Sequence, residues 1–381
     1  MKKQIIFTVV AASFAGAASA QSSVTLYGVV DAGLAAVSNQ VANASQMKSG
    51  GSSMVGLTGG NIQGSRWGLR GAEDLGGGLK TIFTLESGFS VINGQQDTAG
   101  NLFNRQAFIG LTNEFGAVTL GRQYDSVVDY LGPLSATGTW GGTYFAHPGD
   151  NDNLNNTIRI NNSVKFQSAD YAGLSFSGVY GFSNQAGGFA NNRAYSVGAG
   201  YKNGGLQLGT AYLQLQGLNS NSNGAVQGVP DYTLAQIPGM QNQRTWGVGG
   251  SYTFGPAVVG GVFTQSRFQD RIVDASVRYN NYEINGRYNL TPAFGLGVAY
   301  TFTQALNSTP AAGSDDNGSA HWNQLAIQAD YALSARTDIY AESAAFLGSN
   351  GNIMPTQING TSAPSSSRNQ FLVSTGIRHR F

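Results

Sequence analysis

The chain has 381 residues, of which 54 are glycine and only 11% are charged, and it contains no cysteine. Without cysteine it can form neither a disulfide scaffold nor a thiolate metal site, and a formal net charge of +1 does not imply nucleic acid as a partner. An aromatic content of 11% is not typical of a disordered chain.

The first twenty residues predict export. Two lysines precede an apolar run, and Ala18-Ser19-Ala20 fits a signal-peptide cleavage site, which places the cut between Ala20 and Gln21. The apolar run is too short to cross a bilayer as a helix. We therefore expect a signal peptide over residues 1–20 and a single mature domain over 21–381.

Along the mature chain, residues alternate between an apolar face and a polar or small face, the period of a β-strand. In the clearest case, Tyr282, Ile284 and Tyr288 lie on one face, while Glu283 and Arg287 lie on the other. A soluble β-sandwich would show the same alternation. Aromatic residues recur at the ends of the apolar faces, however, where the interfacial girdles of a membrane barrel would lie.

Sixteen candidate strands follow one another, separated alternately by tight turns and by long loops rich in Asn, Ser and Gly. A tight turn is Lys202–Gly205, and a long loop is expected over Asn39–Ile62. The expected strand starts are Val24, Ser65, Leu79, Asn104, Ala117, Thr157, Leu174, Arg193, Leu206, Gln243, Ala257, Asn281, Phe294, Ala320, Arg336 and Arg368. This pattern predicts an all-β, 16-stranded antiparallel transmembrane barrel with a water-filled interior.

The chain ends on a strand, QFLVSTGIRHRF, rather than on a polar tail. Phe371, Val373, Ile377 and Phe381 share its apolar face. An unpaired strand edge in lipid leaves backbone groups unsatisfied, so this strand should pair with the first one. We expect Phe381 to anchor the closing edge.

Four segments in order resemble the trimeric general-diffusion porins of Gram-negative bacteria, in the β-proteobacterial type. They are SVTLYGVVDAG, SRWGLRGAEDLGGGLKTIFTLESGF, NRQAFIGLTNEFGAVTLGRQYDSV and the terminal GIRHRF. The resemblance covers essentially the whole mature chain. It implies a homotrimer in the outer membrane that lets small hydrophilic solutes and inorganic ions diffuse passively, with a third extracellular loop, about residues 124–156, folded into the lumen.

The resemblance also implies a ladder of basic residues on the barrel wall at the constriction, at Arg66, Arg122 and Arg159. Strand phase independently places Arg66 and Arg159 on a wet face, whereas Arg122 shares its face with apolar residues. Arg70 and Lys165 are further candidates on wet faces, and the alternative for these two is simple solvation.

The inward loop should face this ladder. Its expected tip, PLSATGTWGG, holds Ser135, Thr139 and Trp140 and has no carboxylate, although related porins often carry acids there. Asp125 and Asp129 lie nearer the start of the loop. Unopposed arginines favour anions, so the sequence predicts a mild anion preference.

Partners follow from the resemblance and the compartment. They are outer-membrane lipid and lipopolysaccharide, other copies of the chain, and the outer-membrane assembly machinery, which would read Phe381. The stretch DNDNLNN from Asp150 could bind Ca²⁺ weakly, but it lacks the Gly and distal Glu of an EF-hand loop, and a solvated loop is the alternative.

Three rival functions compete with the general-diffusion channel. A catalytic barrel would need a nucleophile beside a base, and the three histidines (His147, His321 and His379) show no such local signature, so we expect no enzyme activity. A secreted soluble sandwich would have to hide an apolar face that runs through too many strands. A barrel with a specific solute site in its pore stays open.

Overall fold

The computed structural model describes residues 23–41, 51–98, 100–218, 220, 222–227, 241–270, 275–307, 318–349 and 356–381. The predicted signal peptide, with its cleavage site at Ala20 and Gln21, lies outside these residues. Most of the described chain is strand: β1 Ser23–Gln40, β2 Ser52–Gly59, β3 Arg66–Gly76, β4 Leu79–Gly88, β5 Gln106–Asn113, β6 Gly116–Gln123, β7 Ile160–Ser168, β8 Leu174–Gly181, β9 Arg193–Asn203, β10 Leu206–Gln216, β11 Asn242–Phe254, β12 Ala257–Gln269, β13 Ser276–Asn289, β14 Phe294–Asn307, β15 Ser319–Ala332, β16 Thr337–Gly348 and β17 Asn369–Arg380.

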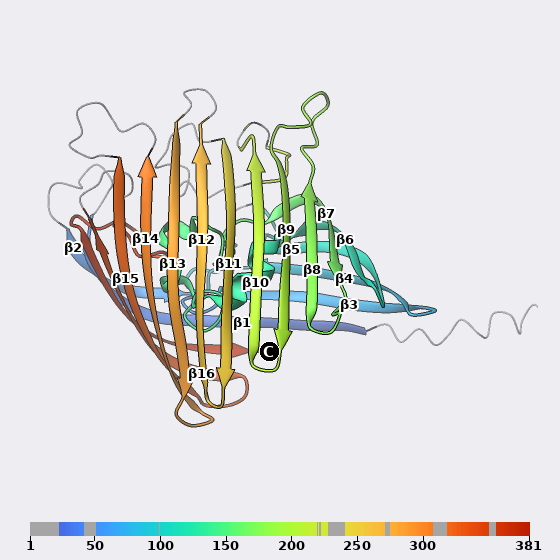
Figure 1. Ribbon diagram of the computed structural model, residues 1–381. Helices are drawn as coiled ribbons and strands as arrows, with labels where there is room; N and C mark the ends of the chain where they lie inside the picture. The colour runs from blue at the N-terminus through green and yellow to red at the C-terminus, as the bar shows by residue number, and fades with distance from the viewer. Residues whose placement is uncertain are drawn as a thin grey trace, which may run out of the picture.

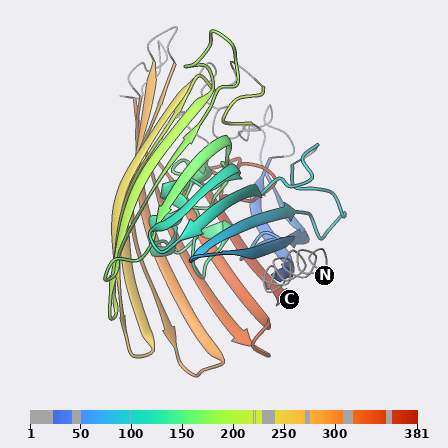
Figure 2. The same cartoon turned by 90° about the vertical axis from the view of Figure 1, so that its right-hand side faces the viewer.

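These strands form one antiparallel sheet that closes into a barrel (Figures 1 and 2). From β3 to β17 each strand pairs with its neighbour in sequence, and the last strand, β17, pairs with β1 from Val29 opposite Arg380 to Val37 opposite Leu372. Closure satisfies the backbone groups at both edges, as a barrel in hydrocarbon requires. Among the described residues, no helix has the length and hydrophobicity needed to cross a bilayer.

Two strands share one position in the barrel. The loop-side half of β1 pairs with β2, and its other half pairs with β3. Seventeen strands therefore fill sixteen positions, as predicted. The expected loop over Asn39–Ile62 is wrong in part, because β2 lies within it. Its sequence, SSMVGLTG, alternates weakly, and only Val55 and Leu57 mark the outer face.

The predicted strand starts agree with the structure to within three residues at fifteen of the sixteen positions. The exception is β13, which begins at Ser276 and not near Asn281. Its first residues place Arg278 on the same face as Tyr282, which hides the apolar alternation that the prediction relied on.

The outer face of the barrel is apolar and exposed, whereas the inner face is polar or covers the inward loop. Val55, Val373 and Ile284 expose 75%, 60% and 60% of their surface. A soluble protein would not leave an apolar belt of this kind in water, so the outer wall is built to contact lipid. Inside, Phe145 and Leu154 of the inward loop pack in one cluster with apolar side chains of the wall.

The seam depends on the last residue. The backbone of Phe381 exchanges two hydrogen bonds with Gly28, at 3.0 and 3.1 Å. The Phe381 ring lies over Gly28, so closely that a Cβ atom at this position would collide with the ring and with the carbonyl oxygen of Arg66. The chain therefore needs glycine where its two ends meet.

We predict that Gly28→Val prevents closure or weakens it by about 1–3 kcal/mol, because the new side chain must displace both the ring and the β3 backbone. The matched control is Gly178→Val, also on the outer face, where the nearest atom to an added Cβ would lie 3.8 Å away. Folded barrels resist unfolding in cold SDS, so the fraction that migrates as compact protein in unheated samples measures the effect. Equal folding of the two variants would contradict this account of the seam.

Candidate functional site

The segment between β6 and β7 folds into the barrel (Figures 1 and 2), as predicted for residues 124–156. It contains helix α2, Ser126–Tyr130, followed by 3₁₀ turns at Gly132–Leu134, Thr143–Phe145 and Pro148–Asp150. Asp125 starts α2, because its carboxylate accepts the backbone N–H of Val127 at 2.7 Å. Its other oxygen accepts the Asn153 amide at 2.6 Å. Asp125 is thus a structural residue of the loop.

A buried charge cluster fixes this loop to the wall. His147 Nδ1 lies 2.6 Å from Asp152 of the loop, and Nε2 lies 3.0 Å from Glu283 of β13. All three side chains are fully buried. Glu283 also accepts the backbone N–H of Ala136 at 2.7 Å, and Asp152 accepts the Thr264 hydroxyl of β12 at 2.5 Å. The His147 ring between two carboxylates therefore joins distant points of the loop to two neighbouring strands.

Lys165, a predicted member of the basic ladder, is a second anchor. Its ammonium group lies 2.5 Å from the Asp129 carboxylate and donates to the Tyr124 carbonyl oxygen at 2.9 Å. Both acceptors belong to the start of the inward loop. Lys165 therefore holds the loop and does not line the cavity described next.

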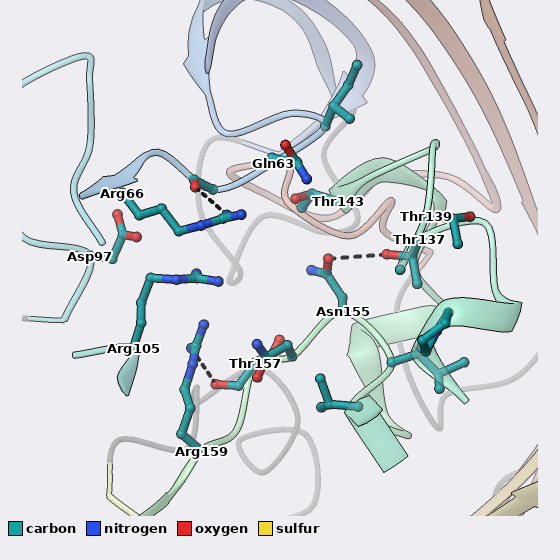
Figure 3. A pocket seen from close by; sticks show the side chains of 18 of the residues that line it. Gln63, Arg66, Asp97, Arg105, Thr137, Thr139, Thr143, Asn155, Thr157 and Arg159 are labelled. Carbon is teal, nitrogen blue, oxygen red and sulfur yellow. Dashed lines mark hydrogen bonds between the residues drawn. The ribbon is translucent and has the colours of Figure 1, made fainter. Parts of the chain in front are cut away.

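A cavity of about 680 Å³ separates the loop from the wall (Figure 3). One side carries the guanidinium groups of Arg66, Arg105 and Arg159. The other side is uncharged. Its hydroxyl and amide groups belong to Gln63, Thr137, Thr139, Thr143 and Asn155, and Val128, Pro133 and Leu154 line it as well. The lining contains one described carboxylate, Asp97, which lies beside the arginines, and partial desolvation raises its pKa above the usual value.

Glu86 on β4 holds two of these arginines from behind. Arg105 Nε donates to its carboxylate at 2.8 Å, and Arg66 Nε lies 3.6 Å from the other oxygen. Tyr27 and Tyr124 donate their hydroxyls to the same carboxylate at 2.9 and 3.1 Å. Three guanidinium groups against two carboxylates, Glu86 behind them and Asp97 beside them, leave the cavity wall positive.

Arg159 lacks such a counter-ion. Its Nη1 donates to the carbonyl oxygen of Thr157 at 3.2 Å, and its Nε is buried without a hydrogen-bond partner. Among the three arginines on this wall, Arg159 is therefore the one with the most unsatisfied donor capacity toward an anion.

Asp31 on β1 fixes the segment between β2 and β3, part of which lines the cavity. It is fully buried, and one of its oxygens accepts the backbone N–H groups of Ile62 and Gln63, both at 2.9 Å. The other oxygen accepts the Tyr340 hydroxyl at 2.6 Å. These bonds shape the break between β2 and β3, from which Gln63 and Arg66 reach the cavity.

The predicted ladder is thus brought together only in part. Arg66 and Arg159 line the cavity. Arg122 does not; it sits at a β-bulge, where its guanidinium donates to Asn104 O at 2.9 Å and to the Asn161 side chain. Arg70 is exposed, with its guanidinium 5.3 Å from the centre of the Tyr27 ring.

The sequence analysis did not predict Arg105 and Glu86 as residues of this site. Arg105 shares an apolar phase in sequence, but it precedes β5, which begins at Gln106, and so is free to turn inward. The sequence does indicate that Glu86 points into the barrel, because Phe83 and Leu85 mark the opposite, apolar face of β4.

The predicted loop residues divide by burial. Thr139 lines the cavity, whereas Ser135 and Trp140 are buried in the loop. Ser135 donates to Gly132 O at 2.9 Å, and the Trp140 ring packs 5.2 Å from the Phe145 ring.

The Asp150 carboxylate of the DNDNLNN stretch accepts hydrogen bonds from the protein backbone. Asp150 accepts the backbone N–H groups of Asn155 and Thr157 at 2.9 and 3.1 Å. No group of three or more His, Cys, Asp or Glu residues suited to a metal occurs in the described part of the chain. The weak Ca²⁺ expectation therefore gains no support from these residues and stays untested.

The His147 cluster predicts a pH dependence. Burial lowers the pKa of His147, but the neighbouring carboxylates of Asp152 and Glu283 outweigh it and raise the pKa to about 10, while an unfolded histidine titrates near pH 6.5. The raised pKa means that the contribution of this group to stability is complete below about pH 6.5 and is lost as pH rises towards 10. His147→Gln should lower the stability by about 3–5 kcal/mol near neutral pH and flatten its fall above pH 7.

Apparent thermal unfolding midpoints in detergent between pH 6 and 10 measure both effects. The control is His379→Gln, since His379 is exposed at the turn side and bonds Thr337 at 2.8 Å. A pH profile of the H147Q variant parallel to that of the wild type would show that the imidazolium is not the anchor.

The chain is similar to known outer-membrane proteins. A family model described as Gram-negative porin matches residues 8–351. An outer membrane porin protein of Bordetella pertussis is 38% identical over 273 residues, 67% of this chain and 66% of that protein. Outer membrane porin protein 32 of Delftia acidovorans is 30% identical over the full length of both chains. The solved anion-selective porin from Comamonas acidovorans covers 95% of this chain and 100% of its own, at a TM-score of 0.73 and 25% identity.

Proposed function

The chain belongs to the Gram-negative porin family, and on that premise we propose that it forms a water-filled channel through which small hydrophilic solutes and ions diffuse passively, with a mild preference for anions. The protein is an outer-membrane β-barrel with an apolar belt outside and a polar lumen inside. The observation that carries the anion preference is the cavity between an arginine wall and an uncharged loop face.

The size of the preference follows from elementary electrostatics. A unit charge about 5 Å from a passing ion contributes roughly 1 kcal/mol in water, and salt at physiological strength screens it over about 8 Å. Glu86 and Asp97 offset part of the field of the three arginines. The channel should therefore favour anions several-fold and still pass cations. The similar porin from Comamonas acidovorans is anion-selective, which is consistent with this proposal.

We further propose a homotrimer whose chains are recognised by the assembly machinery through Phe381. The family resemblance supports the trimer. The position of Phe381 at the barrel seam supports a role in assembly, because the residue that closes the barrel is available only while the chain is still open.

That the chain is not an enzyme stays a prediction. The described environments of its histidines give other roles for them: His147 anchors the loop, His379 bonds Thr337 at the rim, and His321 lies on the outer face beside the Phe302 ring, 6.0 Å away.

Arg105 and Glu86 form one hydrogen-bonded pair of opposite charges, so replacing each in turn should shift the ion selectivity in opposite directions. Arg105→Gln removes a positive charge from the cavity wall and should lower the anion-to-cation permeability ratio roughly two- to fivefold. Glu86→Gln removes the negative charge behind the same arginine and should raise the ratio by a similar factor. Reversal potentials across planar bilayers in a KCl gradient measure both.

Arg336→Gln is the control, since Arg336 is exposed in a turn at the far end of the barrel and should leave the ratio unchanged. Shifts of the same sign in R105Q and E86Q, or a cation-selective wild type, would reject the proposal.

A further inference from the structure

Three arginines lie in a row on the outer wall, away from the pore. Arg244 of β11 is directly opposite Arg267 of β12, which is directly opposite Arg278 of β13. They share the strand phase of Trp246, Phe263 and Tyr282, the lipid-facing side chains of these strands. Arg244 and Arg278 are exposed, and Arg267 is half-buried. We call these three residues the arginine row.

The three cations of the row repel one another. Side chains directly opposite on neighbouring strands lie about 5 Å apart, where like charges destabilise a sheet. Among the residues that the structure describes, no carboxylate pairs with any of the three; Arg267 donates to the Ser276 hydroxyl at 3.2 Å. The arrangement is explained if an anion from outside the chain lies over the row.

The side chains below the row follow the depth profile of a membrane. One register step inward, Trp246 Nε1 donates to Gln265 at 3.2 Å, and the Gln265 amide donates to Asn280 at 2.9 Å. One step further, the Phe263 ring lies 5.3 Å from Trp246 and 5.0 Å from Tyr282. Aromatic rings, then amides, then cations match the order of acyl chain, interface and headgroup.

The row lies at the loop side of the barrel. β11 and β13 begin, and β12 ends, within a few residues of it, at the upper end of these strands in Figure 1. The tight turns that join β11 to β12 and β13 to β14 lie at the other end. In an outer-membrane barrel the loop side faces the cell exterior, so the row is at the level of the outer-leaflet headgroups.

We propose that the arginine row binds the phosphorylated headgroup of an outer-leaflet glycolipid. A phosphate monoester carries close to two negative charges and accepts the paired N–H groups of an arginine, so adjacent guanidiniums match it in charge and geometry. The Trp246–Gln265–Asn280 chain then contacts the sugar or ester region, and the aromatic rings contact the acyl chains. This inference rests on the outer-membrane location and not on conduction.

The test is binding of diphosphoryl lipid A to purified, folded protein in detergent, followed by native mass spectrometry. Each basic residue near a charged headgroup contributes enough for roughly a fivefold change in affinity, so Arg244→Gln with Arg278→Gln should weaken binding about thirtyfold. These two are chosen because both are exposed and can be replaced without opening the core. The charge-matched control, Lys80→Gln with Arg336→Gln, removes two exposed cations at the turn side and should bind like the wild type.

Two further arms identify the ligand and the site. Lipid A without its phosphates should bind the wild type as weakly as the R244Q/R278Q variant binds the diphosphoryl form. Millimolar inorganic phosphate should not compete, because it lacks the acyl chains. The proposal is overturned if the two double variants bind equally, if dephosphorylated lipid A binds as well as the phosphorylated form, or if inorganic phosphate displaces the lipid.

Conductance and reversal potential, measured on the same preparations, separate this inference from the proposed function. R244Q/R278Q should keep the wild-type values, since the row faces away from the lumen. If the protein binds lipid A through the row but forms no channel, the proposed channel function is rejected and the lipid site stands. If the protein forms a normal channel but R244Q/R278Q binds lipid A like the wild type, the lipid site is rejected and the channel function stands.

Discussion

The structure depends on one constraint: in hydrocarbon, no backbone N–H or C=O group can be left without a partner. A sheet meets this constraint only by closing on itself, which here means pairing β17 with β1. Closure explains why the chain ends on a strand and not on a polar tail. It also explains why Phe381 and Gly28 fit against each other at the seam. With the backbone satisfied, side chains alternate freely between lipid and lumen.

A wide closed barrel leaves an interior that its wall cannot fill, and the inward loop occupies this space. The loop is held by ionic contacts at His147 and Lys165, both of which replace water with buried or half-buried counter-charges. Charged side chains therefore have two roles inside the barrel. Paired charges fix the loop, and incompletely paired guanidiniums, above all Arg159, face the solute path. β12 and β13 contact the His147 cluster on their inner face and carry two members of the arginine row, Arg267 and Arg278, on their outer face.

The alternation of apolar and polar residues predicted the strands and their faces, which depend on neighbouring residues alone. Strand phase gave fifteen of sixteen strand starts closely, and it placed Arg66 and Arg159 on the wet face. It missed β2, whose glycines and serines give almost no contrast between faces. It could not assign Lys165, because a lysine on a wet strand looks the same whether it faces solvent or meets Asp129 from another segment. Arg105, just before β5, meets Glu86 of β4, and Arg122 is diverted by a bulge that no periodicity reveals.

Water and solutes should pass between the inward loop and the arginine wall while the outer face stays in lipid. The chain has no cysteine, so single cysteines report position cleanly. In bilayers, N155C in the cavity should react with charged thiosulfonate reagents, faster with an anionic than with a cationic one, and each reaction should lower the conductance. V55C, whose parent side chain is 75% exposed on the outer face, should not react with either. An unreactive N155C, or a V55C that reacts equally fast, would contradict the account.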